Sequence, residues 1–176
     1  MELRDGATLV REWLATDEAE LAVLADDRRI WLNLRDAFPH PYSREDARRF
    51  IAQALQRVPP SFFAITHEGR LAGAIGYATH VDVERIGAEI GYWVARALWG
   101  RGLATTALRL VVAHAFRADP ELRRVYAVPY ATNPASARVL EKAGFTREGT
   151  LRQSALKDGQ VLDQWLYSIL RDEATR

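Results

Sequence analysis

The segment from Trp99 to Thr105 has the clearest chemical potential in this sequence. Its two glycines, Gly100 and Gly102, are separated by one residue, and glycine lets a backbone approach a ligand closely because it has no Cβ atom. An amphipathic pattern begins directly afterwards at Leu103 and predicts a helix. The first turn of a helix presents unpaired N–H groups and the positive end of the helix dipole. The segment is therefore predicted to hold a pyrophosphate through its backbone amides.

Two well-known nucleotide-binding loops do not fit this segment. A dinucleotide-binding fingerprint has the spacing G-x-G-x-x-G after the first strand, whereas Thr105 occupies the third glycine position here and the segment lies past mid-chain. A P-loop requires G-K-S/T after a longer spacing, which is absent. The remaining alternative is a plain glycine turn that precedes a helix and binds nothing.

A second segment, from Asn133 to Gly144, combines helix caps with polar side chains. Asn133 at the N-cap, Pro134 at the first helical position and Gly144 after the last turn predict a short helix. Capping uses only the side-chain oxygen of Asn133, so its amide N–H₂ group remains available to a ligand. Ser136 lies one turn into the helix, where its hydroxyl is a candidate hydrogen-bond donor.

The order of four segments resembles the GCN5-related N-acetyltransferase (GNAT) superfamily. These segments are Ala88–Val94 (AEIGYWV), Trp99–Ala104 (WGRGLA), Asn133–Ser136 (NPAS) and Val139–Phe145 (VLEKAGF). The glycine segment is similar to the Q/R-x-x-G-x-G/A pyrophosphate loop of that superfamily, except that Trp99 stands where glutamine or arginine is commoner. This departure, with the EIGYW run, is similar to the branch of ribosomal-protein N-terminal acetyltransferases (RimJ/RimL type).

The resemblance extends from about Thr8 to Arg171 and implies one N-acetyltransferase domain over residues 1–176. The implied fold is α/β in the α+β sense, with a mixed, mainly antiparallel sheet of about seven strands, helices on both faces and a splayed strand that binds acetyl-CoA. The free backbone of residues 90–94 would pair with the pantetheine arm, and Gly91 could accommodate a bulge there. Arg101 or Arg96 could add positive charge near the pyrophosphate.

The resemblance assigns acetyl-CoA binding to a set of residues on three segments. They are Tyr92, Trp93, Val94, Gly100, Arg101, Gly102, Leu103, Ala104, Thr105, Asn133 and Ser136. Acetyl-CoA is expected as a co-substrate, in a direct transfer of the acetyl group to an amine. A noncatalytic acetyl-CoA sensor or partner-binding module is the alternative.

The implied reaction needs a neutral amine. A lysine-like amine with a pKa of about 10.4 is only ~0.1% neutral near pH 7.4, a deficit of roughly 4 kcal/mol, whereas an α-amine with a pKa of about 7.7–8 is roughly a quarter neutral. Glu89 is the best candidate for the base, because superfamily members often place a carboxylate at this point, and Ser136 is the candidate donor to the departing thiolate. His80 and Tyr130 are alternatives, and Asp163 could bind a cationic acceptor.

The connection from Arg29 to Tyr42 is the predicted acceptor-binding segment, because aromatic, charged and proline residues are crowded there. Trp31 and Phe38 are expected to pack as core residues. The candidate acceptor contacts are Asp36, His40 and Tyr42. A protein or peptide N-terminus, a polyamine, an amino sugar and a small amino metabolite all remain open as acceptors.

The elements that must position these residues alternate irregularly between strands and helices. Strands are predicted at residues 8–12, 61–66, 71–79, 84–94 and 124–128, with two final strands around Asp158–Gly159, and helices at 17–24, 43–58, from 103, and 133–143. Ser43 with Asp46 forms a capping box, and Pro59 ends that helix. Because strands come in runs, the sheet is expected to be mainly antiparallel.

Composition narrows the class of protein. The chain has 176 residues, and its 24 lysines and arginines nearly balance 23 acidic residues, so neither a nucleic acid nor a membrane surface is expected as a partner. The absence of cysteine excludes disulfides, thiolate metal sites and a cysteine nucleophile, and the four histidines show no ligand spacing, so no metal is expected. Without a long apolar run, the expected location is cytoplasmic. A homodimer is possible by analogy with relatives.

Overall fold

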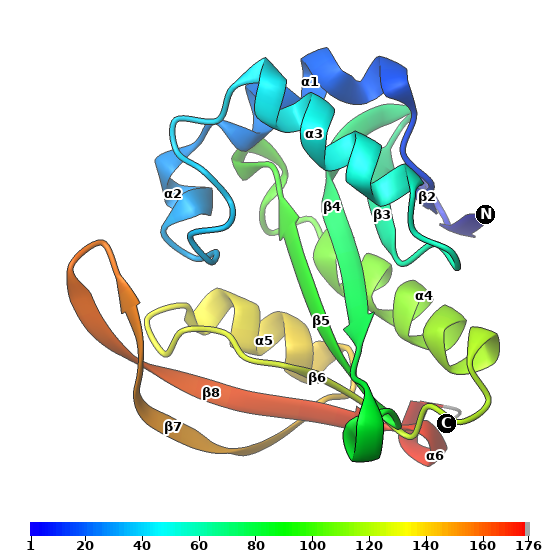
Figure 1. Ribbon diagram of the computed structural model, residues 1–176, viewed down its shortest axis with the longest axis vertical. Coiled ribbons are helices and arrows are strands. Elements are labelled where there is room, and N and C mark those ends of the chain that lie inside the picture. Colours follow the sequence, from blue (N-terminus) through cyan, green and yellow to red (C-terminus); the bar gives the residue numbers. More distant parts are fainter. Residues whose placement is uncertain (175–176) are drawn as a thin grey trace.

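A computed structural model describes residues 1–174 and shows one eight-stranded sheet in the order β1-β2-β3-β4-β5-β6-β8-β7 (Figure 1). The strands are β1 (Glu2–Asp5), β2 (Thr8–Arg11), β3 (Phe62–His67), β4 (Arg70–Thr79), β5 (Gly87–Val94), β6 (Arg124–Ala127), β7 (Thr146–Lys157) and β8 (Gln160–Leu170). The helices are α1 (Glu18–Ala25), α2 (Arg28–Trp31), α3 (Arg44–Leu55), α4 (Leu103–Ala118), α5 (Pro134–Lys142) and α6 (Arg171–Ala174). Short 3₁₀ turns lie at Ala15–Asp17, Asp82–Glu84 and Arg96–Leu98.

The sheet is antiparallel except where β5 pairs with β6. The predicted mixed, mainly antiparallel sheet is therefore confirmed, with eight strands in place of about seven. The additional strand is β1, which pairs with β2 at the edge of the sheet. Its side chains are mostly exposed on both faces, so it lacks the apolar alternation that identifies a strand in a sequence.

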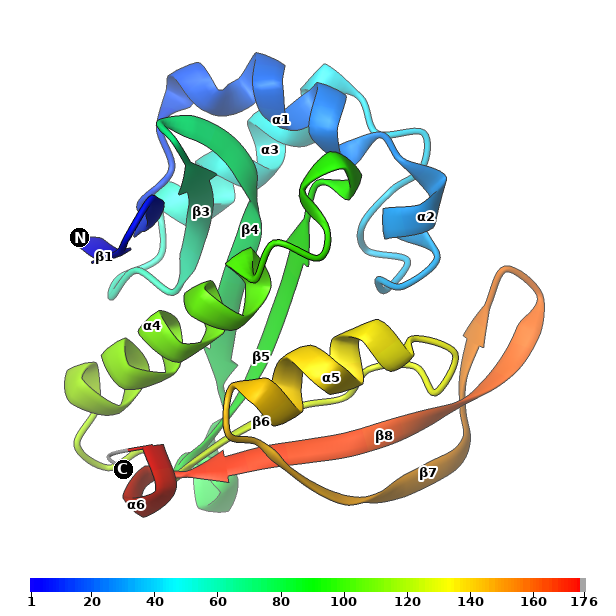
Figure 2. The same ribbon diagram turned by 180° about the vertical axis from the view of Figure 1, so that it is seen from behind.

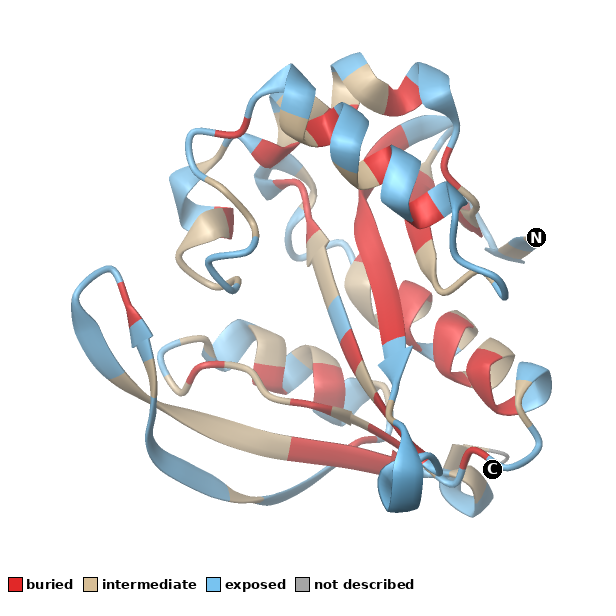
Figure 3. Ribbon diagram, in the orientation of Figure 1, coloured by how far each residue is buried: buried red, intermediate tan, exposed pale blue. Residues whose placement is uncertain are grey.

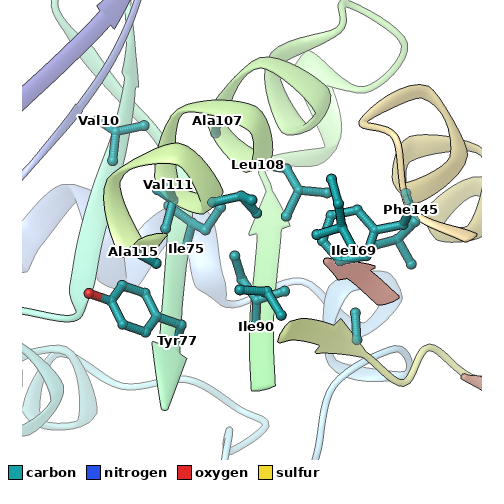
Figure 4. Close-up of a cluster of buried hydrophobic side chains, with 14 of the residues drawn as sticks. Val10, Ile75, Tyr77, Ile90, Ala107, Leu108, Val111, Ala115, Phe145 and Ile169 are labelled. Carbon is teal, nitrogen blue, oxygen red and sulfur yellow. The ribbon is translucent and has the colours of Figure 1, made fainter. Parts of the chain in front are cut away.

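Helices cover both faces of the sheet, as predicted (Figure 2). Successive side chains of a strand point to opposite faces, so Phe63 and Ile65 join the core beneath α4, whereas Ala64 packs with α1 and α3. Figure 4 shows Ile75 and Ile90 facing α4 in the first of these cores. Buried residues are concentrated in the central strands and α4, while β7 is mostly exposed (Figure 3).

The sheet divides between β5 and β6. The parallel ladder joins only Gly87–Glu89 to Arg124–Tyr126, after which the two strands diverge (Figure 1). On its other side, β5 stays paired with β4 as far as Val94. The ladder between β4 and β5 runs through Gly91 without a register shift, so the bulge expected at Gly91 is wrong. The strands separate because their pairing stops.

The β7–β8 hairpin reaches over to α2 (Figure 1). Lys157 Nζ donates to Asp36 Oδ1 over 2.7 Å, and Arg28 donates to Asp158 over 2.5 Å. The Lys157 ammonium also lies 3.7 Å from the centroid of the Trp31 ring, and its side chain is only 2% exposed. Two ion pairs and a cation–π contact thus hold the hairpin tip against α2 and the segment that follows it.

The other predicted elements lie near their predicted positions, with small errors at their ends, whereas the short helices α2 and α6 were not predicted. Ser43 accepts a hydrogen bond from the Asp46 amide in the predicted capping box of α3. That helix ends at Leu55 and does not reach Val58, since a residue before proline disfavours helical torsion angles. β5 begins at Gly87, three residues later than predicted, because a 3₁₀ turn precedes it. Within residues 1–174, no helix combines the length and apolar character needed to cross a bilayer.

Candidate active site

A single cavity of about 1190 Å³ occupies the division between β5 and β6. Its walls come from β4 and β5, the start of α4, α5, and the segment between α2 and α3. Typical ligand pockets measure about 300–1,000 Å³, so this cavity has room for more than one small ligand. It is the place where the chain could bring two reactants together.

The glycine segment forms one end of this cavity. Gly100 and Gly102 have φ angles of 77° and 83°, a left-handed conformation that favours glycine. Gly102 is the N-cap of α4, and its carbonyl accepts the first intrahelical hydrogen bond, from Thr106, over 3.0 Å. The three preceding amides, those of residues 103–105, precede any intrahelical acceptor. A Cβ atom added at Gly100 or Gly102 would meet nothing within 4 Å, so the backbone here faces open space and fits a pyrophosphate.

Trp99 fastens this segment to the end of β5. Its indole N–H donates to the carbonyl oxygen of Val94 over 2.7 Å, and the residue, 48% exposed, lines the cavity. The residue that departs from the family pattern therefore has a structural partner within the same turn. The contact keeps the glycine loop beside the free edge of β5.

The positive charge of the cavity comes from residues that the sequence did not single out. Arg101 is not among the residues that line it, and Arg96 pairs with Asp27 over 3.1 Å. Arg138 and Lys142 line the cavity instead. They lie four residues apart on α5, so they share one face of the helix. Two basic residues four positions apart on a predicted helix were therefore the sequence pattern that could have identified this positive charge.

The Tyr92 hydroxyl contacts Ser136 across the cavity. Its oxygen lies 2.9 Å from Ser136 Oγ and 3.3 Å from the Ser136 carbonyl oxygen, to which it donates. Burial raises the pKa of Tyr92 to about 12, so the phenol keeps its proton at neutral pH. Asn133 Oδ1 accepts from the Ser136 amide over 3.1 Å, as the capping pattern predicted. The sequence had assigned Tyr92 only to cofactor binding.

Glu89 is the last residue of β5 that pairs with β6, where the two strands divide, and it lines the cavity. Arg35 donates a hydrogen bond to Glu89 Oε1, and this bond raises the pKa of Arg35. Arg35 belongs to the predicted acceptor-binding segment but was not a named candidate. Because the two residues are 54 positions apart, no local pattern links them.

The three alternative candidates have other surroundings. His80 Nε2 lies 2.9 Å from the Tyr126 hydroxyl and does not line the cavity. Asp163 accepts a hydrogen bond from the Gln153 amide over 2.7 Å, also outside the cavity. Tyr130 does line the cavity, and its hydroxyl donates to the Leu34 carbonyl over 3.4 Å.

The predicted acceptor-binding segment, residues 29–42, contributes to the cavity, but not through all of its expected residues. Tyr42 lines the cavity and is buried, which raises the pKa of Tyr42 to about 12. Asp36 and His40 do not line it: Asp36 pairs with Lys157, and the ring centroid of His40 lies 5.7 Å from that of Trp31. Phe38, expected in the core, packs beside Tyr42 with ring centroids 4.7 Å apart.

Most of the residues predicted from the sequence meet in this one cavity. They are Glu89, Tyr92, Trp93, Val94, Gly100, Gly102, Leu103, Ala104, Thr105, Asn133, Ser136 and Tyr42. Arg101, Asp36 and His40 are the exceptions. Within residues 1–174, no group of three or more histidine, aspartate or glutamate side chains could hold a metal ion.

Comparison with known proteins gives a consistent set of relatives. The family described as Acetyltransferase (GNAT) domain matches residues 8–146. The chain is 31% identical over 133 residues to the ribosomal-protein-serine acetyltransferase of Escherichia coli, covering 74% of this chain and 73% of the relative. It is 39% identical over 101 residues to the uncharacterized N-acetyltransferase YoaA of Bacillus subtilis, covering 57% of this chain and 56% of the relative.

The alignment spans a little over half the length, 58% and 56%, of the first two curated relatives. Among solved structures, Mycobacterium smegmatis RimJ in complex with CoA-disulfide superposes with a TM-score of 0.83 at 25% identity, covering 100% of this chain and 88% of that one. The overall fold is therefore shared with a protein of known structure.

Proposed function

Because the chain belongs to the acetyltransferase (GNAT) domain family, we propose that it is an acetyl-CoA-dependent N-acetyltransferase that modifies the α-amine of a protein or peptide N-terminus. One observation carries the proposal: a single cavity joins an open glycine loop at a helix N-terminus to Glu89 and Ser136. The relative from Escherichia coli, whose name describes a ribosomal-protein-serine acetyltransferase, supports a protein as acceptor.

The chain offers acetyl-CoA a binding site of suitable chemistry. The amides of residues 103–105 and the positive end of the α4 dipole suit the pyrophosphate, and Arg138 and Lys142 add charge from α5. The edge of β5 that leaves β6 after Glu89 can pair with the amides of the pantetheine arm as a further strand would. When bound, acetyl-CoA supplies an acetyl thioester, whose acetyl carbon exchanges its bond to sulfur for a bond to the acceptor nitrogen.

Ser136 and Tyr92 form the proposed donor to the leaving thiolate. Tyr92 keeps its proton at neutral pH because burial raises its pKa to about 12. The phenol has a single proton; when it is donated to Ser136 Oγ across the 2.9 Å contact, in place of the Ser136 carbonyl, the serine O–H is left to point into the cavity. A thiolate with a pKa near 8.5 needs little proton help, so two neutral hydroxyls in series suffice.

Glu89 is the proposed base that receives the amine proton. An α-amine is already roughly a quarter neutral near pH 7.4, which places only a small demand on a carboxylate. Glu89 lies at the point where β5 leaves β6, inside the cavity and with a side chain 26% exposed, so water can mediate the transfer.

The test combines acetyl-CoA with a panel of amines and follows free thiol with a thiol-reactive dye. The protein itself has no cysteine and adds no background signal. Thiol release with peptides of free N-terminus, and lower release with polyamines and amino sugars, is expected. Glu89→Gln should reduce kcat by about fourfold or more, because only about a quarter of an α-amine is neutral near pH 7.4. Glu84 is an exposed carboxylate outside the cavity, so Glu84→Gln should leave kcat unchanged. Calorimetric binding of acetyl-CoA without turnover of any amine would instead indicate a sensor.

A further inference from the structure

The acceptor side of the cavity carries more positive than negative charge. The ionised side chains that line the whole cavity are Arg29, Arg35, Arg49, Arg138, Lys142, Asp46 and Glu89. Arg138 and Lys142 belong to α5, on the side proposed for the phosphates of acetyl-CoA. Three arginines and two carboxylates remain around the site of the acceptor.

Those two carboxylates are already engaged by two of the arginines. Asp46 accepts hydrogen bonds from Arg49 and from the capping Ser43, so it is committed to α3. Glu89 accepts from Arg35. Arg29 lines the same cavity, and within residues 1–174 its guanidinium has no carboxylate partner.

From this arrangement we infer that the acceptor carries a carboxylate close to its reactive amine, bound by Arg35 and Arg29; the inference rests on the proposed transferase function. A guanidinium can donate two parallel hydrogen bonds to a carboxylate, and Arg35 is 69% exposed and therefore reachable. A polycationic acceptor would meet the unpaired charge of Arg29, which disfavours polyamines and aminoglycosides.

Binding of an acceptor carboxylate by Arg35 also changes the surroundings of the proposed base, Glu89. Glu89 Oε1 is occupied by Arg35, whereas a base must be free to accept the amine proton. A carboxylate of the acceptor that takes over Arg35 leaves Glu89 beside the incoming ammonium group, and the four charges pair in a new order. Binding of the correct acceptor thereby exposes the base.

Two sources of this chemistry are distinguishable: a peptide with an acidic side chain near its N-terminus, and a free amino acid with its own carboxylate. The experiment compares kcat/KM for three peptides that share an N-terminal serine and differ only in the next two residues, which are glutamate, glutamine or lysine. Free glutamate is the fourth acceptor. We expect the preferred acceptor to be an acidic one, with the glutamate peptide at least about fivefold above the glutamine peptide if the source is a peptide.

Arg29→Gln and Arg35→Gln should each move the ratio of acidic to neutral acceptor toward one. The matched control is Arg4→Gln, because Arg4 is exposed on β1, outside the cavity, and should leave the ratio unchanged. Thermal unfolding and acetyl-CoA affinity establish that each variant is folded.

The comparison of kcat/KM among the acidic, neutral and basic acceptors uses the wild-type protein, so it tests the inference even if a variant fails to fold. Equal use of the acidic and neutral acceptors, or preference for the lysine peptide, overturns the inference and leaves the transferase proposal intact. If none of the amines supports thiol release, both the inference and the transferase proposal are overturned. A preference for free glutamate identifies a free amino acid as the source.

Discussion

Replacement of Tyr92 by phenylalanine tests the proposed donor pair most directly. Tyr92→Phe removes one hydroxyl and preserves the ring that packs against the core. The lost contacts are the 2.9 Å contact to Ser136 Oγ and the 3.3 Å bond to the Ser136 carbonyl. Asn133 still holds the Ser136 amide, so the helix start should stay in place.

The expected magnitudes follow from those contacts. A neutral hydrogen bond contributes about 1 kcal/mol net, so unfolding should become easier by about 1 kcal/mol. Freed from its partner, the Ser136 hydroxyl can rotate away from the cavity, and a loss of about 1.4 kcal/mol of transition-state stabilisation lowers kcat about tenfold. The KM for acetyl-CoA should change little, because the backbone edge and the glycine loop are untouched.

A double-mutant cycle with Ser136→Ala separates this reasoning from a general structural effect. If Tyr92 acts through Ser136, the double variant should turn over no more slowly than Ser136→Ala alone. The control is Tyr167→Phe, which removes the 2.9 Å hydrogen bond that the buried Tyr167 hydroxyl donates to Glu141. Glu141 lies on α5, like Ser136, but neither Tyr167 nor Glu141 lines the cavity. Additive losses in kcat, or a loss in Tyr167→Phe equal to that in Tyr92→Phe, would refute the assignment.

Two further predictions concern the loop and the hairpin. Gly102→Ala forces a left-handed conformation on alanine, which should lower the stability by about 1 kcal/mol and also raise the Kd for acetyl-CoA. The control is Gly69→Ala, at a φ of 78° in a distant hairpin, which should lower the stability without changing that Kd. Thermal unfolding measures the stability and calorimetry measures the Kd. A hydrogen bond from Arg124 lowers the pKa of Glu148 from 4.5 to about 2, so the carboxylate contributes stability above pH 4.5 that is lost as the pH falls toward 2. Glu148→Gln should cost about 1 kcal/mol or less at pH 7. The difference between its urea midpoint and that of the wild type should shrink as the pH falls below 4.5 and vanish near pH 2, and a constant difference across this range would contradict the assignment.

The sequence by itself determined the features that depend on neighbours a few residues apart. The start of α4 directly after the two glycines, the Ser43 box of α3 and the Asn133 cap of α5 all appear where they were predicted. In each case a side chain or a torsion angle acts within one turn, so the pattern and the structure contain the same information. The prediction that these elements form a divided sheet came from the resemblance to the family.

The tertiary structure alone decided which polar groups meet. Tyr92 and Ser136 are 44 residues apart, Arg35 and Glu89 are 54 apart, and the Asp36 carboxylate is bound by a lysine 121 residues further along. That lysine contact holds Asp36 away from the cavity, while the Arg35 contact places a guanidinium on the proposed base. A hydrogen bond forms only within about 3 Å, and the path of the chain between such partners depends on the packing of the whole sheet. Local composition therefore predicted the presence of these groups, and only the fold determined their pairing.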